Sequence, residues 1–204
     1  MTAAMTMMKW GAHASFLLAA AFIVAPLIYV MGPVRATIGP SAYDLADFLF
    51  GPVWGVSLVT AVFALRERIG EAAPRRSTLA LVAAALSAAM FVAAALFRST
   101  NRQYHALHPE LHLESSSIVL LVWTTLLAGV TATGWHFLGW SLLMLGSAGW
   151  ATRRLPRGLS AIYLVAGISS LFVYRLPILE GMSALLGAVW GTWQGILLWN
   201  AEQG

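Results

Sequence analysis

The chain contains no cysteine, has a single lysine, and carries charge on only 10% of its 204 residues. Without cysteine, disulfide bonds, thiolate metal ligands and catalytic thiols are excluded. A lysine-linked retinal is excluded as well, because the one lysine, Lys9, precedes the first long apolar run. A soluble domain carries about 25% charged residues, so this chain has less than half the usual share. These absences leave little material for a domain surrounded by water.

Apolar residues make up 59% of the chain, and the mean hydropathy is +0.77. They gather in six stretches, at residues 13–31, 42–65, 77–97, 115–152, 158–174 and 181–200. About 20 apolar residues in a helix cross the hydrocarbon core of a bilayer. The sequence therefore predicts an all-α polytopic membrane bundle, with residues 1–204 forming one domain and six transmembrane helices favoured.

The stretch 115–152 is too long for one ordinary crossing. Its 38 residues would form a helix of about 57 Å, against hydrocarbon of about 30 Å. We expect a break near Gly129 and Gly134. Two crossings would make seven spans and divide the lysine and arginines six against six, whereas one crossing divides them eight against four. The second division favours six spans in the cell membrane, with both termini on the cytoplasmic side. Residues 115–133 would then lie at the outer surface or be partly inserted.

Glycine, arginine and proline recur in the second half of the chain. Gly134, Gly139 and Gly146 precede the segment Arg153-Arg154-Leu155-Pro156-Arg157. Over roughly residues 134–199 this pattern resembles a family of uncharacterised small bacterial polytopic membrane proteins, a domain of unknown function. The resemblance implies about six spans, and because no activity is established for that family it implies no catalytic residues.

Three histidines, His105, His108 and His112, lie within eight residues of the predicted loop 98–114. On a helix, His108 and His112 would share one face, as two zinc ligands do. Pro109 separates them, however, and no glutamate stands where the H-E-x-x-H general base stands. We favour a hydrated interfacial loop, and a divalent-metal or pH-sensing site outside the membrane is the alternative.

A haem held by two histidines is a further option for a cofactor. His13 and His136 lie at the ends of predicted spans. Six spans place them on opposite faces of the membrane, which excludes a shared haem, whereas seven spans place them on the same side. No other cofactor is predicted.

Two acids, Asp44 and Asp47, open the second predicted span, where acids are costly and often functional. Ser41 and Asp44 have the spacing of a capping box, which accounts for Asp44. Asp47 lies one turn further in, and Arg35 of the preceding loop is its predicted partner. We favour a structural ion pair over a proton relay, because no further acids follow deeper in the span.

Small residues recur at four-residue spacing in two predicted spans. Gly187, Gly191 and Gly195 share one face of the last helix, and Gly51 and Gly55 flank Pro52. Such glycines let helices approach closely, either within this bundle or at an interface with another copy or subunit. Tryptophans near the ends of the predicted spans indicate an aromatic belt: Trp54, Trp135, Trp140, Trp150 and Trp199.

No phosphate-binding loop or nucleophile elbow is present, and arginines beside spans are expected to meet lipid phosphate rather than nucleic acid. Two functions remain open. The first is an accessory, structural or sensory subunit that packs against other membrane proteins and is not an enzyme. The second is a small membrane-embedded enzyme or carrier for a lipid-soluble substrate such as a quinone, isoprenoid or lipid, with or without assistance from metal or haem.

Overall fold

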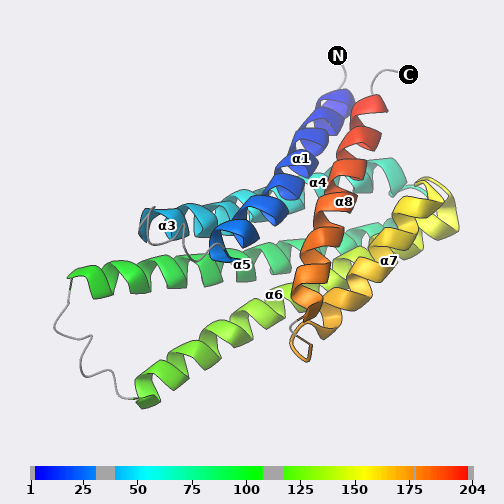
Figure 1. The fold of residues 1–204 in the computed structure, drawn as a ribbon. Helices are drawn as coiled ribbons and strands as arrows, with labels where there is room; N and C mark the ends of the chain where they lie inside the picture. The colour runs from blue at the N-terminus through cyan, green and yellow to red at the C-terminus, as the bar shows by residue number, and fades with distance from the viewer. Residues whose placement is uncertain (1–2, 31–39, 108–116, 177, 202–204) are drawn as a thin grey trace.

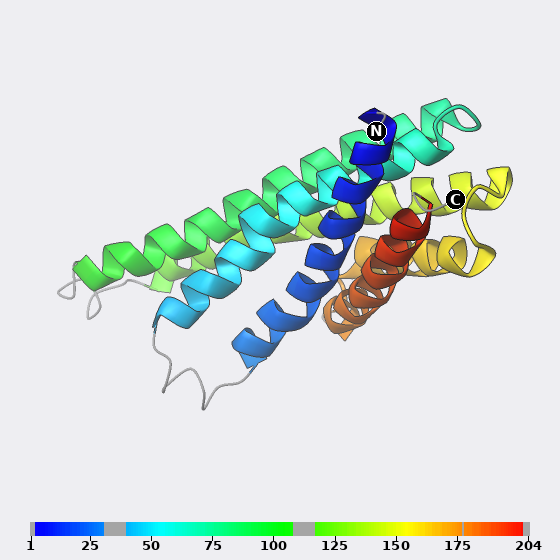
Figure 2. The same ribbon diagram turned by 90° about the horizontal axis from the view of Figure 1, so that it is seen from above.

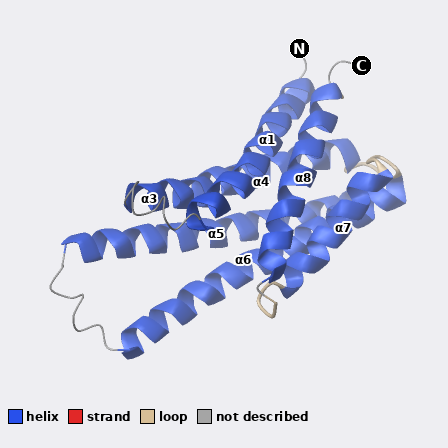
Figure 3. Cartoon of the chain, viewed as in Figure 1, coloured by secondary structure: helices blue, strands red, loops and turns tan. Residues whose placement is uncertain are grey.

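The computed structural model describes residues 3–30, 40–107, 117–176 and 178–201, and every regular element in these ranges is a helix (Figures 1 and 3). In chain order these are α1 (Ala3–Val30), α3 (Pro40–Phe48), the π-helical segment η1 (Leu49–Val53), α4 (Trp54–Ile69), α5 (Pro74–Leu107), α6 (Ser117–Thr152), α7 (Arg157–Phe172) and α8 (Ile178–Asn200). The all-α prediction is confirmed.

Three helical stretches in the described residues are long and apolar enough to cross a membrane. They are Met7–Ile28 in α1, Ala42–Ile69 through α3, η1 and α4, and Pro74–Tyr104 in α5. The helix Arg157–Phe172 is apolar but shorter. The helices α6 and α8 are not among these three stretches, although their sequences are largely apolar. Helices suited to a membrane are thus confirmed, and the count of six spans stays a prediction.

The predicted break inside residues 115–152 is wrong, because α6 continues without interruption from Ser117 to Thr152. An interior glycine costs a helix only about 1 kcal/mol relative to alanine. Gly134 faces the ring of Phe91 on α5, and its carbonyl accepts a hydrogen bond from Ser87 Oγ at 2.8 Å. Packing on α5 therefore compensates the glycine. One unbroken helix cannot turn back, which removes the seven-span alternative.

The predicted loop 98–114 is also partly wrong, because α5 continues to Leu107. No proline or glycine interrupts the chain between Pro74 and Pro109, so nothing ends the helix where its apolar run ends. Arg98 and Arg102 consequently lie on a helix, one turn apart.

Proline explains the one irregular helical segment. Pro52 lies inside η1, between α3 and α4. Proline has no N–H to donate, and its ring collides with the carbonyl four residues earlier. A π-helical turn relieves that collision, and the helical path continues from α3 through η1 into α4.

Aromatic rings fill the centre of the bundle. Phe22 contacts Trp54 at 5.7 Å and Trp190 at 6.0 Å, and Phe91 contacts Trp54 at 4.8 Å and Trp135 at 5.3 Å between ring centroids. The aromatic-belt prediction is therefore wrong for Trp54 and Trp135, which are 0% and 2% exposed. Their indoles pack against rings from neighbouring helices, a contact that one-dimensional position along a span does not reveal.

Both termini and two of the turns lie at one end of the molecule (Figures 1 and 2). His13 of α1 contacts Trp199 of α8 at 5.5 Å between ring centroids. The α4–α5 and α6–α7 turns meet there, since Arg68 Nε donates to the carbonyl of Arg154 at 3.4 Å. Beyond the other helices, α5 and α6 extend at the opposite end, where the two helices diverge (Figures 1 and 2).

Candidate functional site

Two acids of α3 and two arginines of α5 form an ion-pair cluster. Arg98 Nε donates to Asp47 Oδ1 at 2.6 Å. Arg102 Nη2 donates to Asp47 Oδ2 at 2.5 Å and to Asp44 Oδ1 at 2.7 Å. Ser99 Oγ adds a bond to Asp44 Oδ1 at 3.2 Å. The Asp47 side chain is 2% exposed, whereas that of Asp44 is 42% exposed.

Helical spacing builds this cluster from both sides. Asp44 and Asp47 are three residues apart on α3, and Arg98 and Arg102 are four apart on α5, so each pair shares one face. Sequence reasoning missed these partners because it ended the helix at Phe97. The signal was present in the matched spacing of acids and arginines. Arg35, the predicted partner of Asp47, lies outside the described residues.

The predicted capping box stays a prediction, because the side chain of Ser41 lies outside what the structure describes. The helix α3 begins at Pro40, so Ser41 is its second residue. Proline suits a first helical position, where its missing N–H costs no hydrogen bond. The side chain of Asp44 is positioned by hydrogen bonds from Arg102 and Ser99 of α5.

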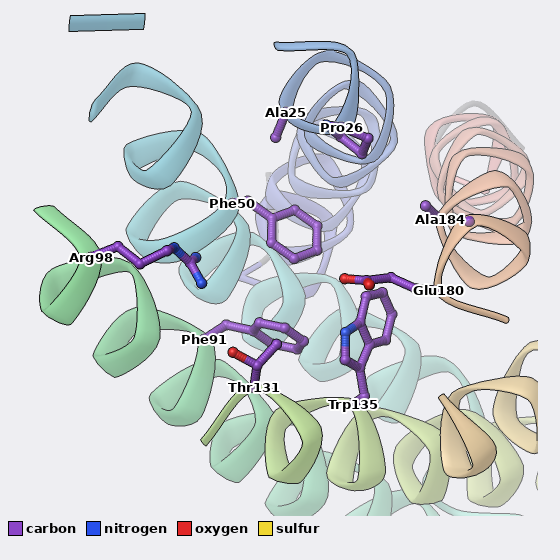
Figure 4. Close-up of a pocket in the computed structure, with 10 residues that line it drawn as sticks. Ala25, Pro26, Phe50, Phe91, Arg98, Thr131, Trp135, Glu180 and Ala184 are labelled. Carbon is purple, nitrogen blue, oxygen red and sulfur yellow. The ribbon is translucent and has the colours of Figure 1, made fainter. Parts of the chain in front are cut away.

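Beside the cluster lies a cavity of about 390 Å³, bounded by α1, η1, α5, α6 and α8 (Figure 4). Its walls are mostly apolar, and its polar groups are few. The lining residues are Ala25, Pro26, Phe50, Phe91, Arg98, Thr131, Trp135, Glu180, Gly181 and Ala184. Ligand cavities of about 300–1,000 Å³ with aromatic walls and a few polar groups are common in proteins.

Trp135 supplies this cavity with a buried, unpartnered donor. Its side chain is 2% exposed, and its Nε1 has no hydrogen-bond partner in the structure. Figure 4 shows the indole nitrogen on the side of the ring that faces Phe91. A buried donor without an acceptor costs about 1–3 kcal/mol. Trp54 Nε1 and Ser160 Oγ are also unpartnered, but neither residue lines the cavity.

Arg98 connects the cavity with the ion-pair cluster. Its Nε is held by Asp47, and its guanidinium lies at the cavity wall (Figure 4). On the opposite wall, the carboxylate of Glu180 extends from the first turn of α8 toward Phe50 (Figure 4). The cavity thus has a cation on one side, an acid and the Trp135 indole on the other, and the rings of Phe50 and Phe91 between them (Figure 4).

The three histidines predicted as a metal site are mostly outside the described residues. His105 lies near the end of α5, and His108 and His112 lie beyond it. Within the described ranges no group of three acids and histidines is arranged to hold a metal ion. The metal hypothesis stays a prediction, and metal analysis of untagged protein tests it.

The two candidate haem histidines have separate neighbours. His13 Nδ1 donates to the carbonyl of Lys9 at 2.8 Å, near Trp199. His136 Nε2 accepts from Trp140 Nε1 at 3.2 Å, one turn along the same helix. The structure does not bring the two imidazoles together.

Intrachain contacts occupy the predicted glycine faces. On α8, a Cβ at Gly187 would meet Phe22, one at Gly191 would meet Ser15 and Ala19, and one at Gly195 would meet Phe16, all on α1. In the segment formed by α3, η1 and α4, a Cβ at Gly51 would meet Ala95 of α5, and one at Gly55 would meet Val92 and Ala88 of the same helix. Any interface with another subunit therefore uses a different surface.

Comparison of the chain with protein-family models gives no match, and comparisons with curated proteins and with solved structures give none either. The resemblance of residues 134–199 to a bacterial membrane family stays a prediction.

Proposed function

We propose that this protein binds a lipid-soluble molecule inside the membrane, in the cavity between α1, η1, α5, α6 and α8. The observation that carries the proposal is the aromatic-walled cavity lined by Trp135, whose buried indole N–H has no hydrogen-bond partner. A ligand with an acceptor oxygen at this position would remove the cost of a buried unsatisfied donor. Among the described residues that line the cavity no nucleophile is paired with a base, and the function that we propose is binding or carriage.

The ligand class follows from the walls. Phe50, Phe91 and Trp135 present rings to the space, and aromatic faces favour a flat ring. Arg98 and Trp135 both offer donors, which suits a molecule with carbonyl oxygens. A quinone-type head group meets these requirements better than an unsubstituted isoprenoid, which offers no acceptor.

The same proposal includes six membrane spans with both termini in the cytoplasm. Eight described cations lie at the end that carries the termini: Lys9, Arg66, Arg68, Arg75, Arg76, Arg153, Arg154 and Arg157. Three, Arg98, Arg102 and Arg175, lie at the other end. Cytoplasmic enrichment in lysine and arginine supports this orientation. In this orientation the cavity lies nearer the outer face of the membrane, because Arg98 and Glu180 line it.

Binding assays on the purified protein test this function. A short-chain quinone, farnesol and a fatty acid are each titrated against the protein in detergent by calorimetry, and an organic extract is analysed by mass spectrometry. We expect the quinone to bind most tightly. The Trp135→Phe variant should bind it about tenfold more weakly, the equivalent of one hydrogen bond of about 1.4 kcal/mol.

Two tryptophans provide matched controls. Trp54→Phe removes another buried unpartnered indole that does not line the cavity, and Trp150→Phe removes one that is 53% exposed. Both variants should bind like the parent protein. Equal losses for Trp135→Phe and Trp54→Phe, or no binding by any of the three ligands, would contradict the proposal.

A further inference from the structure

Seven arginines come together at the end of the molecule that carries the termini. We define this basic end as Arg66, Arg68, Arg75, Arg76, Arg153, Arg154 and Arg157, from the α4–α5 and α6–α7 turns and their flanks. Two acids, Glu67 and Glu71, accompany them, and Arg66 Nη1 pairs with Glu67 Oε1 at 3.5 Å. The opposite end has three described arginines and three acids, Asp44, Asp47 and Glu180. The excess of positive over negative charge is therefore concentrated at one end.

The fold holds these arginines together across distant parts of the sequence. Arg68 Nε donates to the carbonyl of Arg154, and Arg76 Nη1 donates to the carbonyl of Ser147 at 3.3 Å. Both bonds tie the α4–α5 side to the end of α6. None of the seven side chains is buried, so the charge is available to a partner.

Several of these arginines occupy positions where the local backbone conformation or the helix dipole is unfavourable for them. Arg153 has a positive φ of 58°, a conformation that glycine or asparagine ordinarily adopts after a helix. Arg75 and Arg76 lie in the first turn of α5, and Arg157 begins α7, where the helix dipole disfavours cations. A partner with negative charge would offset both costs.

We propose that the basic end binds the head groups of anionic phospholipids. Three apolar stretches that suit a membrane have an end here: Met7–Ile28, Ala42–Ile69 and Pro74–Tyr104. The turns therefore lie at head-group depth, where arginines form bidentate bonds with phosphate. Juxtamembrane basic clusters are attracted to anionic lipid surfaces by the same charge.

The whole protein in nanodiscs tests the inference. Nanodiscs of phosphatidylcholine alone are compared with nanodiscs that contain phosphatidylglycerol, and native mass spectrometry counts the lipids that remain bound. The parent protein should retain phosphatidylglycerol selectively. A triple variant, Arg75→Gln, Arg154→Gln and Arg157→Gln, should lower that retention at least tenfold. Lysine at the same three positions should keep most of it, and Arg175→Gln, at the other end, should keep all of it.

Salt provides a second measurement if the glutamine variant does not fold. The selective retention by the parent protein should fall steeply between low and high ionic strength, because exposed charges are screened. The proposal would be overturned if both lipids were retained equally, if the glutamine variant retained phosphatidylglycerol like the parent protein, or if salt did not lower the retention. It would also be overturned if free inorganic phosphate bound to the protein as well as phosphatidylglycerol does.

Discussion

Arg98 and Asp47 are bonded through Nε and Oδ1 at 2.6 Å, although 51 residues separate them in the chain. Arg102 binds the other oxygen of the same carboxylate. The buried acid thus has an arginine on each oxygen, and this pairing fastens α3 to α5. It also fixes the guanidinium that lines the cavity.

Removing the charge of Asp47 should destabilise the protein. In Asp47→Asn, two arginines that are 22% and 25% exposed lose their shared carboxylate. Breaking a buried pair costs about 3–5 kcal/mol, and partial exposure of the arginines should reduce this to about 2–3 kcal/mol. Unfolding in mixed micelles, followed by circular dichroism, measures the change. The control Asp44→Asn, at a 42% exposed side chain, should cost less than about 1 kcal/mol.

The hydrogen-bond chain through Gln194 predicts strong coupling between two substitutions. Gln194 Nε2 donates to the carbonyl of Ala61 at 3.0 Å, and Gln194 Oε1 accepts from Tyr163 at 2.7 Å. Tyr163→Phe leaves the amide oxygen without that donor, at a cost of about 1–3 kcal/mol. Adding Gln194→Met should recover part of the loss, because both partners are then apolar. A double-mutant cycle measures the coupling, and simple additivity would argue against it.

Bulk added on the α8 glycine face should separate α8 from α1. A Cβ added at Gly191 would lie 3.0 Å from the carbonyl oxygen of Ser15 and 3.1 Å from Ala19 N. Leucine therefore cannot be accommodated without moving the backbone. Gly191→Leu should cost about 3 kcal/mol or more, at the upper end of overpacking effects. Thermal melts and native gels measure it. Gly129→Leu on α6, with nothing within 4 Å, is the control and should melt like the parent protein.

Single cysteines test the six-span topology, and the absence of native cysteine makes the labelling clean. Ala72→Cys and Ala151→Cys lie beside the turns of the basic end, whereas Leu107→Cys and Ile178→Cys lie at the other end. A membrane-impermeant maleimide should label the first two from the cytoplasmic side only and the other two from the outside only. Labelling of Ala151→Cys from the same side as Leu107→Cys would show that α6 does not cross the membrane.

Helix boundaries show where prediction from sequence ended. The apolar runs predicted the positions of the long helices correctly. In hydrocarbon the backbone has no water to bind, and a helix satisfies the backbone hydrogen bonds within itself. The ends of α5 and the continuity of α6 were missed. A helix stops where proline, glycine or a cap ends it, and not where its side chains turn polar. The site was missed for the same reason, since Arg98 and Arg102 were assigned to a loop.

Composition and apolar patterning alone determined that this chain is helical and suited to a membrane, because both properties depend on how residues partition between water and hydrocarbon. Only the tertiary structure decided which residues meet. It brought Asp47 to Arg98, turned Trp54 and Trp135 into the core, and placed Trp135 in the wall of a cavity. Those contacts depend on the rotation of each helix about its axis and on its neighbours, which side-chain packing across the bundle sets and local sequence does not.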